Sequence, residues 1–169
     1  ATLAVLSQFG KKQPGFTEAL GYQLLQAIVD NDRPAITWLI SAGADVRVTN
    51  EAGHDAFALA TQGNSLYALV ALQGETAFYS ASVTCWAIAL RQGDYRFKQL
   101  PVERISDELC DAALLGDRHN YYSLPAEYVS LPALARRCSA MPELIAQLPA
   151  EITLNPVFYQ QVRYQTPCD

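Results

Sequence analysis

The sequence predicts an all-α protein, a solenoid of stacked helical hairpins built from two kinds of short repeat. Three observations predict this class. Apolar residues recur at a fixed interval in the N-terminal part, a Leu-Pro motif recurs at a shorter interval in the C-terminal part, and the apolar runs between the breaks have helical spacing. Two short helices cannot bury their apolar faces alone, so neighbouring hairpins must stack to complete a core.

The composition limits the classes of function. Half of the 169 residues are hydrophobic and 17 % are charged, a balance that excludes a mainly disordered chain. Seventeen Asp and Glu outnumber twelve Lys and Arg, and the net charge of -5 argues against nucleic acid, which requires a concentrated positive patch. The longest apolar stretches, such as residues 66–72, fall far short of a membrane span. We therefore expect a soluble chain with no nucleic-acid partner and no membrane insertion.

The cysteine pattern disfavours both a metal site and a disulfide framework. The four cysteines, Cys85, Cys110, Cys138 and Cys168, stand far apart in the chain, no two of them form a Cys-x-x-Cys motif, and only two histidines accompany them. Tetrahedral zinc needs closely spaced ligands, and disulfide scaffolds carry a higher cysteine density. We expect free, largely buried thiols, with no metal and no cofactor.

The 33-residue period defines the register of the first repeats. It aligns Leu3 with Ile36 and Leu69, Leu6 with Leu39 and Leu72, Gly10 with Gly43, and Ala27 with Ala60. Residues 30–34 form a polar break whose proline suits a first helical turn. Gly43 is expected to end the second helix in the left-handed conformation. Residues 46–48 alternate as a short extended finger would, and residues 49–53 form a turn into the next hairpin.

The N-terminal part resembles the ankyrin-repeat family. Residues 39–46, Leu-Ile-Ser-Ala-Gly-Ala-Asp-Val, are similar to the family's Leu-Leu-x-x-Gly-Ala-Asp-Val string. Residues 53–60 occupy its Gly-x-Thr-Pro-Leu-His-x-Ala frame, although Asp-Ala-Phe-Ala stands at the Thr-Pro-Leu-His positions. A further unit is expected at residues 86–94. The resemblance covers about residues 1–100, with the first repeat truncated, and implies an ankyrin-like α-solenoid.

A second repeat follows, with a 24-residue period. Leu-Pro-x-Glu stands at residues 100–103, 124–127 and 148–151. Ser106, Ser130 and Thr153 precede apolar helical runs and are expected to cap them. These units are similar to the divergent helical repeats of bacterial effector-type proteins. We therefore predict ankyrin-like repeats over residues 1–100 and a divergent α-helical repeat region over residues 101–169, packed on the same solenoid.

The resemblance implies a non-catalytic module that binds another protein, through its fingers and its concave helical surface. The finger positions of this sequence are Lys12, Arg47, Thr49, Glu51, His54 and Asp55. Tyr121 and Tyr122 extend this candidate set, since they form a pair within the polar segment 119–123. Tyrosine provides a large contact area at a small entropic cost.

Catalytic readings of the remaining polar residues are weaker. We expect Cys110 to be buried, away from an exposed His119, and the carboxylate pairs at residues 30/32 and 107/108 to lie at helix ends. The adjacent arginines at 136 and 137 are expected on a solvated helix face. Trp38 and Trp86 lie within apolar runs and are expected in the core.

An alternative function stays open. The chain begins at Ala1 in a register that corresponds to the middle of a hairpin, so it could be the substrate-recruiting repeat domain of a larger enzyme. The catalytic domain of that enzyme, a bacterial effector for example, would precede Ala1. The sequence does not identify the compartment, and it favours a soluble chain, cytoplasmic or delivered into a host cell, over a disulfide-rich extracellular one. The sequence does not identify the partner.

Overall fold

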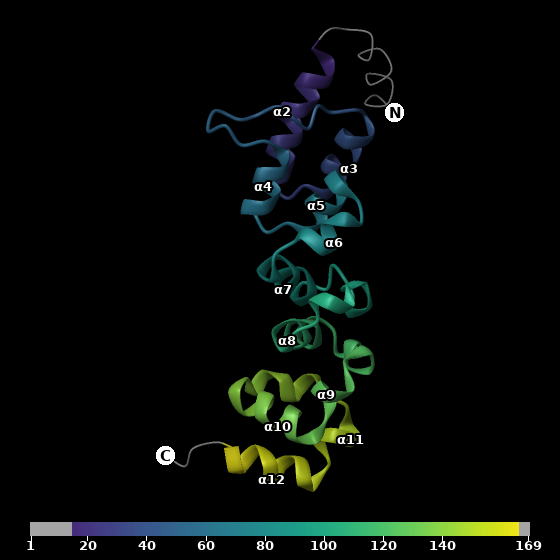
Figure 1. Ribbon diagram of the computed structural model, residues 1–169, viewed down its shortest axis with the longest axis vertical. Helices are drawn as coiled ribbons and strands as arrows, with labels where there is room; N and C mark the ends of the chain where they lie inside the picture. The colour runs from purple at the N-terminus through teal and green to yellow at the C-terminus, as the bar shows by residue number, and fades with distance from the viewer. Residues whose placement is uncertain (1–14, 166–169) are drawn as a thin grey trace. The chain divides into compact units, whose positions relative to one another are not determined.

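The computed structural model describes residues 15–165, and every regular element in this range is a helix. The chain divides into two compact units, Ala1–Cys85 and Trp86–Asp169, with the division inside helix α7 (Val83–Arg91). The first unit contains α2 (Phe16–Val29), α3 (Arg33–Ser41), α4 (Ala56–Gln62), α5 (Leu66–Gln73) and α6 (Thr76–Ser80) (Figure 1). The second contains η1 (Phe97–Gln99), η2 (Val102–Arg104), α8 (Asp107–Gly116), η3 (Arg118–Ser123), α9 (Ala126–Val129), α10 (Leu131–Ala140), η4 (Pro142–Gln147), α11 (Ala150–Thr153) and α12 (Pro156–Gln165). The predicted all-α class is confirmed.

The first unit repeats its backbone turns at the predicted interval. Asn31 and Asn64 each adopt the left-handed conformation, with φ of 53° and 50°. The following residues, Asp32 and Ser65, cap α3 and α5 by accepting hydrogen bonds from the amides of Ala35 and Ala68, at 3.1 and 3.3 Å. Such caps satisfy amide groups that the first helical turn leaves free. The polar break and the turn between α4 and α5 are therefore equivalent structures.

The core of the first unit joins equivalent helices, because α2 packs against α4 and α3 packs against α5. The aligned pairs are buried at both positions, Ala27 with Ala60 and Ile36 with Leu69. At the third aligned set, Leu39 is 3 % exposed whereas Leu72 is only half-buried. The remaining members of the alignment, Leu3, Leu6 and Gly10, lie outside the described residues, as does Lys12.

We expect Leu39→Ala to lower the free energy of unfolding by about 2 to 5 kcal/mol. The substitution removes a buried leucine side chain and leaves a cavity between two packed hairpins. Chemical denaturation followed by circular dichroism measures the change. A midpoint equal to that of the wild-type protein would show that Leu39 does not belong to the core.

The finger loop, residues 42–55, connects α3 to α4 and extends away from the helices (Figure 1). The expected left-handed glycine is confirmed at Gly43, with φ of 89°. The expected extended segment at residues 46–48 is wrong, since the chain makes a turn at residues 46–47. The reason is local, because the Asp45 carboxylate accepts a hydrogen bond from the Arg47 amide at 3.0 Å.

The base of the finger loop packs directly on α2. A Cβ atom at Gly21 would lie 2.4 Å from the carbonyl oxygen of Asp45 and 2.6 Å from a Val48 methyl group. The Asp45 amide donates a hydrogen bond to the carbonyl of Thr17 at 2.9 Å. Glycine at position 21 thus allows the loop to approach the helix, which fixes where the finger emerges.

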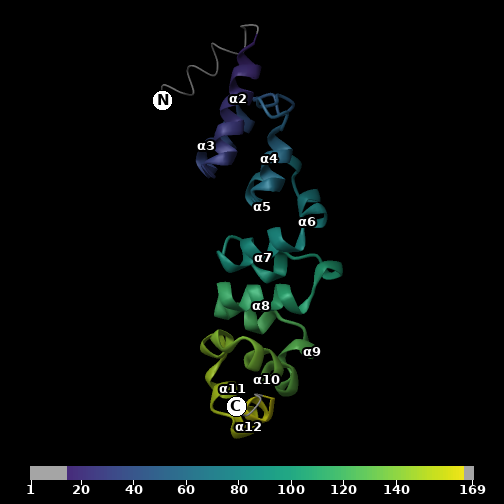
Figure 2. The same ribbon diagram turned by 90° about the vertical axis from the view of Figure 1, so that its left-hand side faces the viewer.

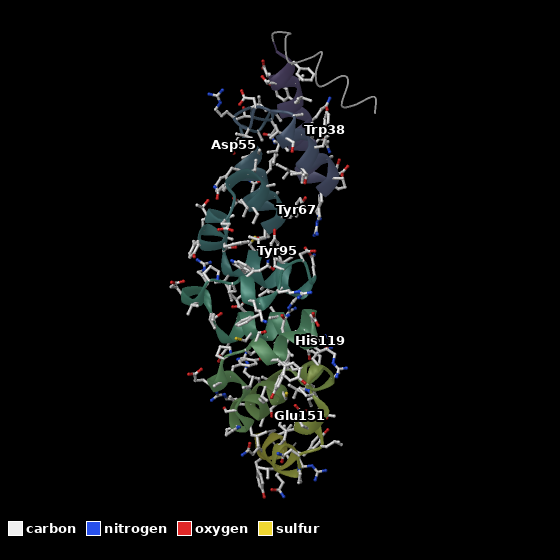
Figure 3. The ribbon with its side chains drawn as sticks, turned by 90° about the vertical axis from the view of Figure 1, so that its right-hand side faces the viewer. Trp38, Asp55, Tyr67, Tyr95, His119 and Glu151 are labelled. Atoms are coloured by element: carbon white, nitrogen blue, oxygen red, sulfur yellow. The ribbon has the colours of Figure 1, made fainter. Side chains whose placement is uncertain are left out.

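Helix α6 occupies residues 76–80, one 33-residue period after residues 43–47 of the finger loop, so this period has a helix where the previous one has a loop. The predicted further unit at residues 86–94 coincides with the end of α7 and a left-handed Gly93. Of the two tryptophans expected in the core, Trp86 is fully buried, whereas Trp38 on α3 is only half-buried (Figure 3). The core prediction is therefore confirmed in full for Trp86 alone.

The second unit follows the predicted 24-residue period. Each Leu-Pro motif has a buried leucine, at Leu100, Leu124 and Leu148, whose amide closes the preceding 3-10 helix. A short helix follows each motif, and then a longer helix, α8, α10 or α12, stacked in chain order (Figure 2). Equivalent positions on the long helices are buried, as Cys110, Leu134 and Phe158 share this spacing and are at most 1 % exposed. The boundary at residue 100 separates repeat types rather than packed units, and it stays a prediction.

The expected helix caps hold only in part. Ser106 caps α8 by accepting from the Leu109 amide at 3.4 Å. The Ser130 hydroxyl instead donates to the Glu127 carbonyl at 3.0 Å, and Thr153 lies inside α11. Asn155 supplies the oxygen that the Val157 amide of α12 needs, at 2.9 Å. Ser130 therefore stands at the N-cap position of α10 as predicted, but its side chain does not cap the helix because the nearer Glu127 carbonyl takes the hydroxyl. The cap prediction for Thr153 is wrong, since Asn155 takes that role.

Candidate functional site

A shallow groove of about 480 Å³ opens in the first unit between α2, α4 and the finger loop. We call it the finger groove. Its lining residues are Tyr22, Leu25, Gln26 and Val29 from α2, Thr49, Asn50 and Glu51 from the finger loop, and Leu59 from α4. Apolar groups therefore form one side of the groove, and polar groups of the loop form the other.

The apolar side of the finger groove is unusually open to solvent. Tyr22 is 51 % exposed and Val29 is 63 % exposed, although both lie on a helix that packs its other face into the core. Tyr22 and Val29 lie about two helical turns apart, and the buried Leu25 lies between them on the same face of α2. A lining so exposed cannot enclose a small molecule, but it can be covered by a second protein surface.

The tip of the finger loop is held by its own hydrogen bonds. The Asn50 side-chain oxygen accepts from the amides of Ala52 and His54, at 3.0 and 2.9 Å. The backbone N–H of Asn50 donates to the His54 carbonyl at 3.0 Å, and Gly53 takes the left-handed conformation that closes the turn. A loop ordered before binding loses less conformational entropy when a partner contacts it. The turn predicted at residues 49–53 is confirmed.

The predicted finger residues take different positions around this loop. Thr49 and Glu51 line the groove and are exposed. The half-buried His54 places its Nε2 3.1 Å from the Gln62 amide nitrogen. Asp55 caps α4 by accepting from the Ala58 amide at 2.8 Å, so its carboxylate has a structural task.

Arg47 lies on the exposed side of the finger loop. Its side chain is 87 % exposed and its Nε lies 3.1 Å from the Asp45 carboxylate. The hydrogen bond from Arg47 lowers the pKa of Asp45 below its usual value, so this pair is charged at neutral pH. An ion pair this exposed adds little to stability, which leaves Arg47 available for a partner.

The charge around the finger groove is acidic. Residues 15–85 contain seven Asp and Glu but only two arginines, Arg33 and Arg47. Arg47 pairs with Asp45, and the Arg33 guanidinium lies 5.2 Å from the ring centre of Tyr67. Glu51 is the charged residue among those that line the groove. The surface therefore attracts a partner that combines apolar and basic side chains.

The predicted tyrosine pair lies in the second unit, on η3 rather than in an irregular loop. The two rings meet edge to face, with centroids 5.4 Å apart and an interplanar angle of 90°. Tyr121 is half-buried, and burial raises the pKa of its hydroxyl. Tyr122 is 72 % exposed and lines a cavity of about 220 Å³ with Pro149. Tyr122 is thus the accessible member of the pair.

A buried ionic cluster that the sequence did not indicate connects α8 to α10. Asp111 is 2 % exposed and pairs with Arg137, whose Nε lies 3.1 Å from one carboxylate oxygen. The hydroxyl of the buried Tyr128 donates to the same carboxylate. The expectation of a solvated arginine pair is therefore correct for Arg136 but wrong for Arg137, because a buried carboxylate requires a positive partner.

The described cysteines are free and buried, as expected, at positions 85, 110 and 138. Burial raises the pKa of the Cys110 thiol to about 12 and that of Cys138 to about 11. His119 is exposed and bonds to Asp117 at 3.0 Å. A thiol that stays protonated at neutral pH is a poor nucleophile, so the Cys110 site is unsuited to covalent catalysis.

We expect the protein to lose stability as the pH rises above about 9. The unfolded chain releases the protons of these thiols near that pH, whereas the folded protein retains them up to about 11 or 12. Each thiol then lowers the free energy of unfolding by about 1.4 kcal/mol per pH unit. Urea denaturation at several pH values measures the slope. The Cys110→Ala/Cys138→Ala variant should show a shallower slope, and an unchanged slope would contradict this explanation.

The class of the protein follows from its fold. Within residues 15–165, no group of three His, Cys, Asp or Glu side chains is placed to hold a metal ion. None of the helices in the same range is both long and apolar enough to cross a membrane. No family model matches the sequence, and no curated protein or solved structure matches it either. The structure itself therefore defines the class as an all-helical protein with an exposed apolar groove.

Proposed function

We propose that this chain is a non-catalytic protein-binding module, which binds another protein through the finger groove. The observation that carries the proposal is the groove itself, where exposed apolar residues of α2 face an ordered polar loop. The partner would cover Tyr22 and Val29 with apolar side chains and place a basic group near Glu51. Burial of such a central apolar patch provides most of the affinity at protein interfaces.

The ankyrin resemblance supports the same reading. The turns at Asn31 and Asn64 recur at the interval that the resemblance predicts, and equivalent helices of the two hairpins pack together. In an ankyrin-like solenoid the fingers and inner helices form the binding surface, which corresponds here to the finger loop and α2. The 24-residue units would extend that solenoid, and Tyr122 would add a second contact.

Site-specific photo-crosslinking tests the proposal and identifies the partner. A photoreactive amino acid replaces Tyr22 in the groove, and in a control protein it replaces Tyr79, which is 63 % exposed on α6 and outside the groove lining. We expect one protein from the native host to crosslink to position 22 and not to position 79. Crosslinking from both positions alike, or from neither, would argue against the groove as the binding site.

Arg47→Glu is expected to weaken binding of that partner, because it removes the guanidinium donors that the exposed Arg47 offers to a contact at the finger, and to leave the melting temperature unchanged. The side chain is 87 % exposed, so its replacement leaves the packing intact, and exposed substitutions usually change stability by less than about 0.5 kcal/mol. The variant reverses a charge at the finger and places it beside Asp45. Calorimetric titration with the purified partner gives the dissociation constant. If the variant and the wild-type protein bound with equal affinity, Arg47 would not belong to the interface.

A further inference from the structure

A second cavity, of about 330 Å³, lies in the second unit between η1 and η3. We call it the η1–η3 cavity. Its lining residues are Arg96, Lys98, Asp117, His119, Asn120 and Ser123. All six residues are polar and two of them carry permanent positive charges, whereas one side of the finger groove is apolar.

The walls of the η1–η3 cavity are fixed by a buried asparagine. Asn120 is 6 % exposed, and its side-chain nitrogen donates to the Ala113 carbonyl at 2.8 Å. Its side-chain oxygen accepts from the Phe97 amide at 3.3 Å. One side chain thereby holds η3 to α8 and to η1, since buried polar groups must satisfy their hydrogen bonds. The basic residues on η1 and the polar residues on η3 are thus kept on opposite sides of one cavity.

The acidic residue of the cavity is already engaged. Asp117 accepts hydrogen bonds from the His119 amide at 2.9 Å and from its Nδ1 at 3.0 Å. Within residues 15–165, Arg96 and Lys98 form no ion pair, and both are exposed. The Asp117 carboxylate also interacts with the charge of Arg96, so two permanent positive charges and one carboxylate give the lining a net positive charge.

The positive surface continues beyond the η1–η3 cavity. His119, at the surface of the second unit (Figure 3), also lines the neighbouring cavity of about 220 Å³ together with Arg118. Arg118 is exposed and likewise forms no ion pair in the described part of the chain. Three basic side chains thus surround His119, in a protein whose net charge is -5.

We propose that the η1–η3 cavity binds a phosphate group, either inorganic phosphate or a phosphate monoester. Such a group carries nearly two negative charges and three strong acceptor oxygens at neutral pH. Arg96 can donate two parallel hydrogen bonds, Lys98 provides a point charge, and the Ser123 hydroxyl provides a further donor. A carboxylate has only two acceptor oxygens and one negative charge, whereas a phosphate group can accept from Arg96, Lys98 and Ser123 together. The shared chemistry is the phosphate group, whether it belongs to free phosphate or to a phosphorylated side chain.

Calorimetric titration of the full chain tests this proposal at constant ionic strength. The probes are inorganic phosphate, a phosphoserine peptide and the same peptide without phosphate. We expect saturable binding at one site, weakened at least about tenfold in Arg96→Ala/Lys98→Ala. The control, Arg91→Ala/Arg136→Ala, removes two exposed arginines outside the cavity lining and should retain wild-type affinity within about twofold. Circular dichroism establishes that both double variants are folded.

The outcomes separate the sources of the phosphate group. Tighter binding of the phosphopeptide than of inorganic phosphate assigns the cavity to a phosphorylated protein, and equal binding assigns it to free phosphate. The absence of saturable binding to both probes would overturn the proposal. An equal loss of affinity in the two double variants would also overturn it, since overall charge rather than the cavity would then be responsible. None of these outcomes depends on the finger groove.

Discussion

Replacing Arg137 with alanine is expected to lower the free energy of unfolding by about 3 to 5 kcal/mol. The substitution leaves the Asp111 carboxylate, which is 2 % exposed, without its positive partner. An unpaired charge in a protein interior is far more costly than the loss of an exposed ion pair. Tyr128 would still donate a hydrogen bond, which compensates only part of the lost interaction. Equilibrium urea denaturation measures the effect.

The neighbouring arginine provides a matched control for this experiment. Arg136 is exposed on the same helix, so Arg136→Ala removes the same charge and the same number of atoms. We expect that variant to lie within about 0.5 kcal/mol of the wild-type protein. A similar loss for the two variants would mean that the net charge of α10, and not the buried pair, determines the result.

Trp86→Ala is expected to cost a similar amount, about 3 to 5 kcal/mol. Trp86 is fully buried, and its ring meets Tyr95 edge to face with centroids 5.9 Å apart. Removal of so large a side chain creates a cavity that the helices cannot fill, and the aromatic contact is lost as well. Denaturation followed by far-ultraviolet circular dichroism measures the loss without relying on tryptophan fluorescence.

Trp38 offers the comparison for this second prediction. It is half-buried on α3, so Trp38→Ala is expected to destabilise the protein clearly less than Trp86→Ala does. Trp86→Phe should recover part of the stability by filling some of the cavity. If the two alanine variants were equally stable, the burial difference between the two tryptophans would not hold in solution.

The repeat periods were accessible to sequence reasoning because they depend on local rules. A capping side chain followed by an apolar stripe indicates a helix start, and Asp32 and Ser106 do cap their helices. Left-handed positions require glycine or asparagine, which made Gly43 recognisable. Apolar residues at equal intervals then indicate which faces are buried, as at Ile36 and Leu69.

The sequence does not predict features that depend on a side chain competing with the backbone, or on contacts between residues far apart in the chain. The turn at the base of the finger arises because the Asp45 side chain competes with an extended backbone, and alternating valines masked that signal. Asp111 and Arg137 are distant in the sequence, and only the packing of α8 and α10 brings them together. Part of the candidate site was foreseen, as Thr49 and Glu51 line the groove, but its apolar side on α2 was not. Tyr22 and Val29 lie on a helix that otherwise has the pattern of an ordinary amphipathic helix. The one signal of a binding surface is that these two apolar residues face solvent.

The affinity of two matched variants for the crosslinked partner tests the central claim most directly. Val29→Glu places a charge on the apolar side of the finger groove, whereas Val102→Glu makes the same change at a valine that is 79 % exposed in the second unit. Burying the new carboxylate under a partner costs several times the thermal energy, so we expect Val29→Glu to weaken binding at least about tenfold. Val102→Glu should bind within about twofold of the wild-type protein. Wild-type affinity in Val29→Glu, measured with a folded variant, would contradict the assignment of the finger groove as the protein-binding surface.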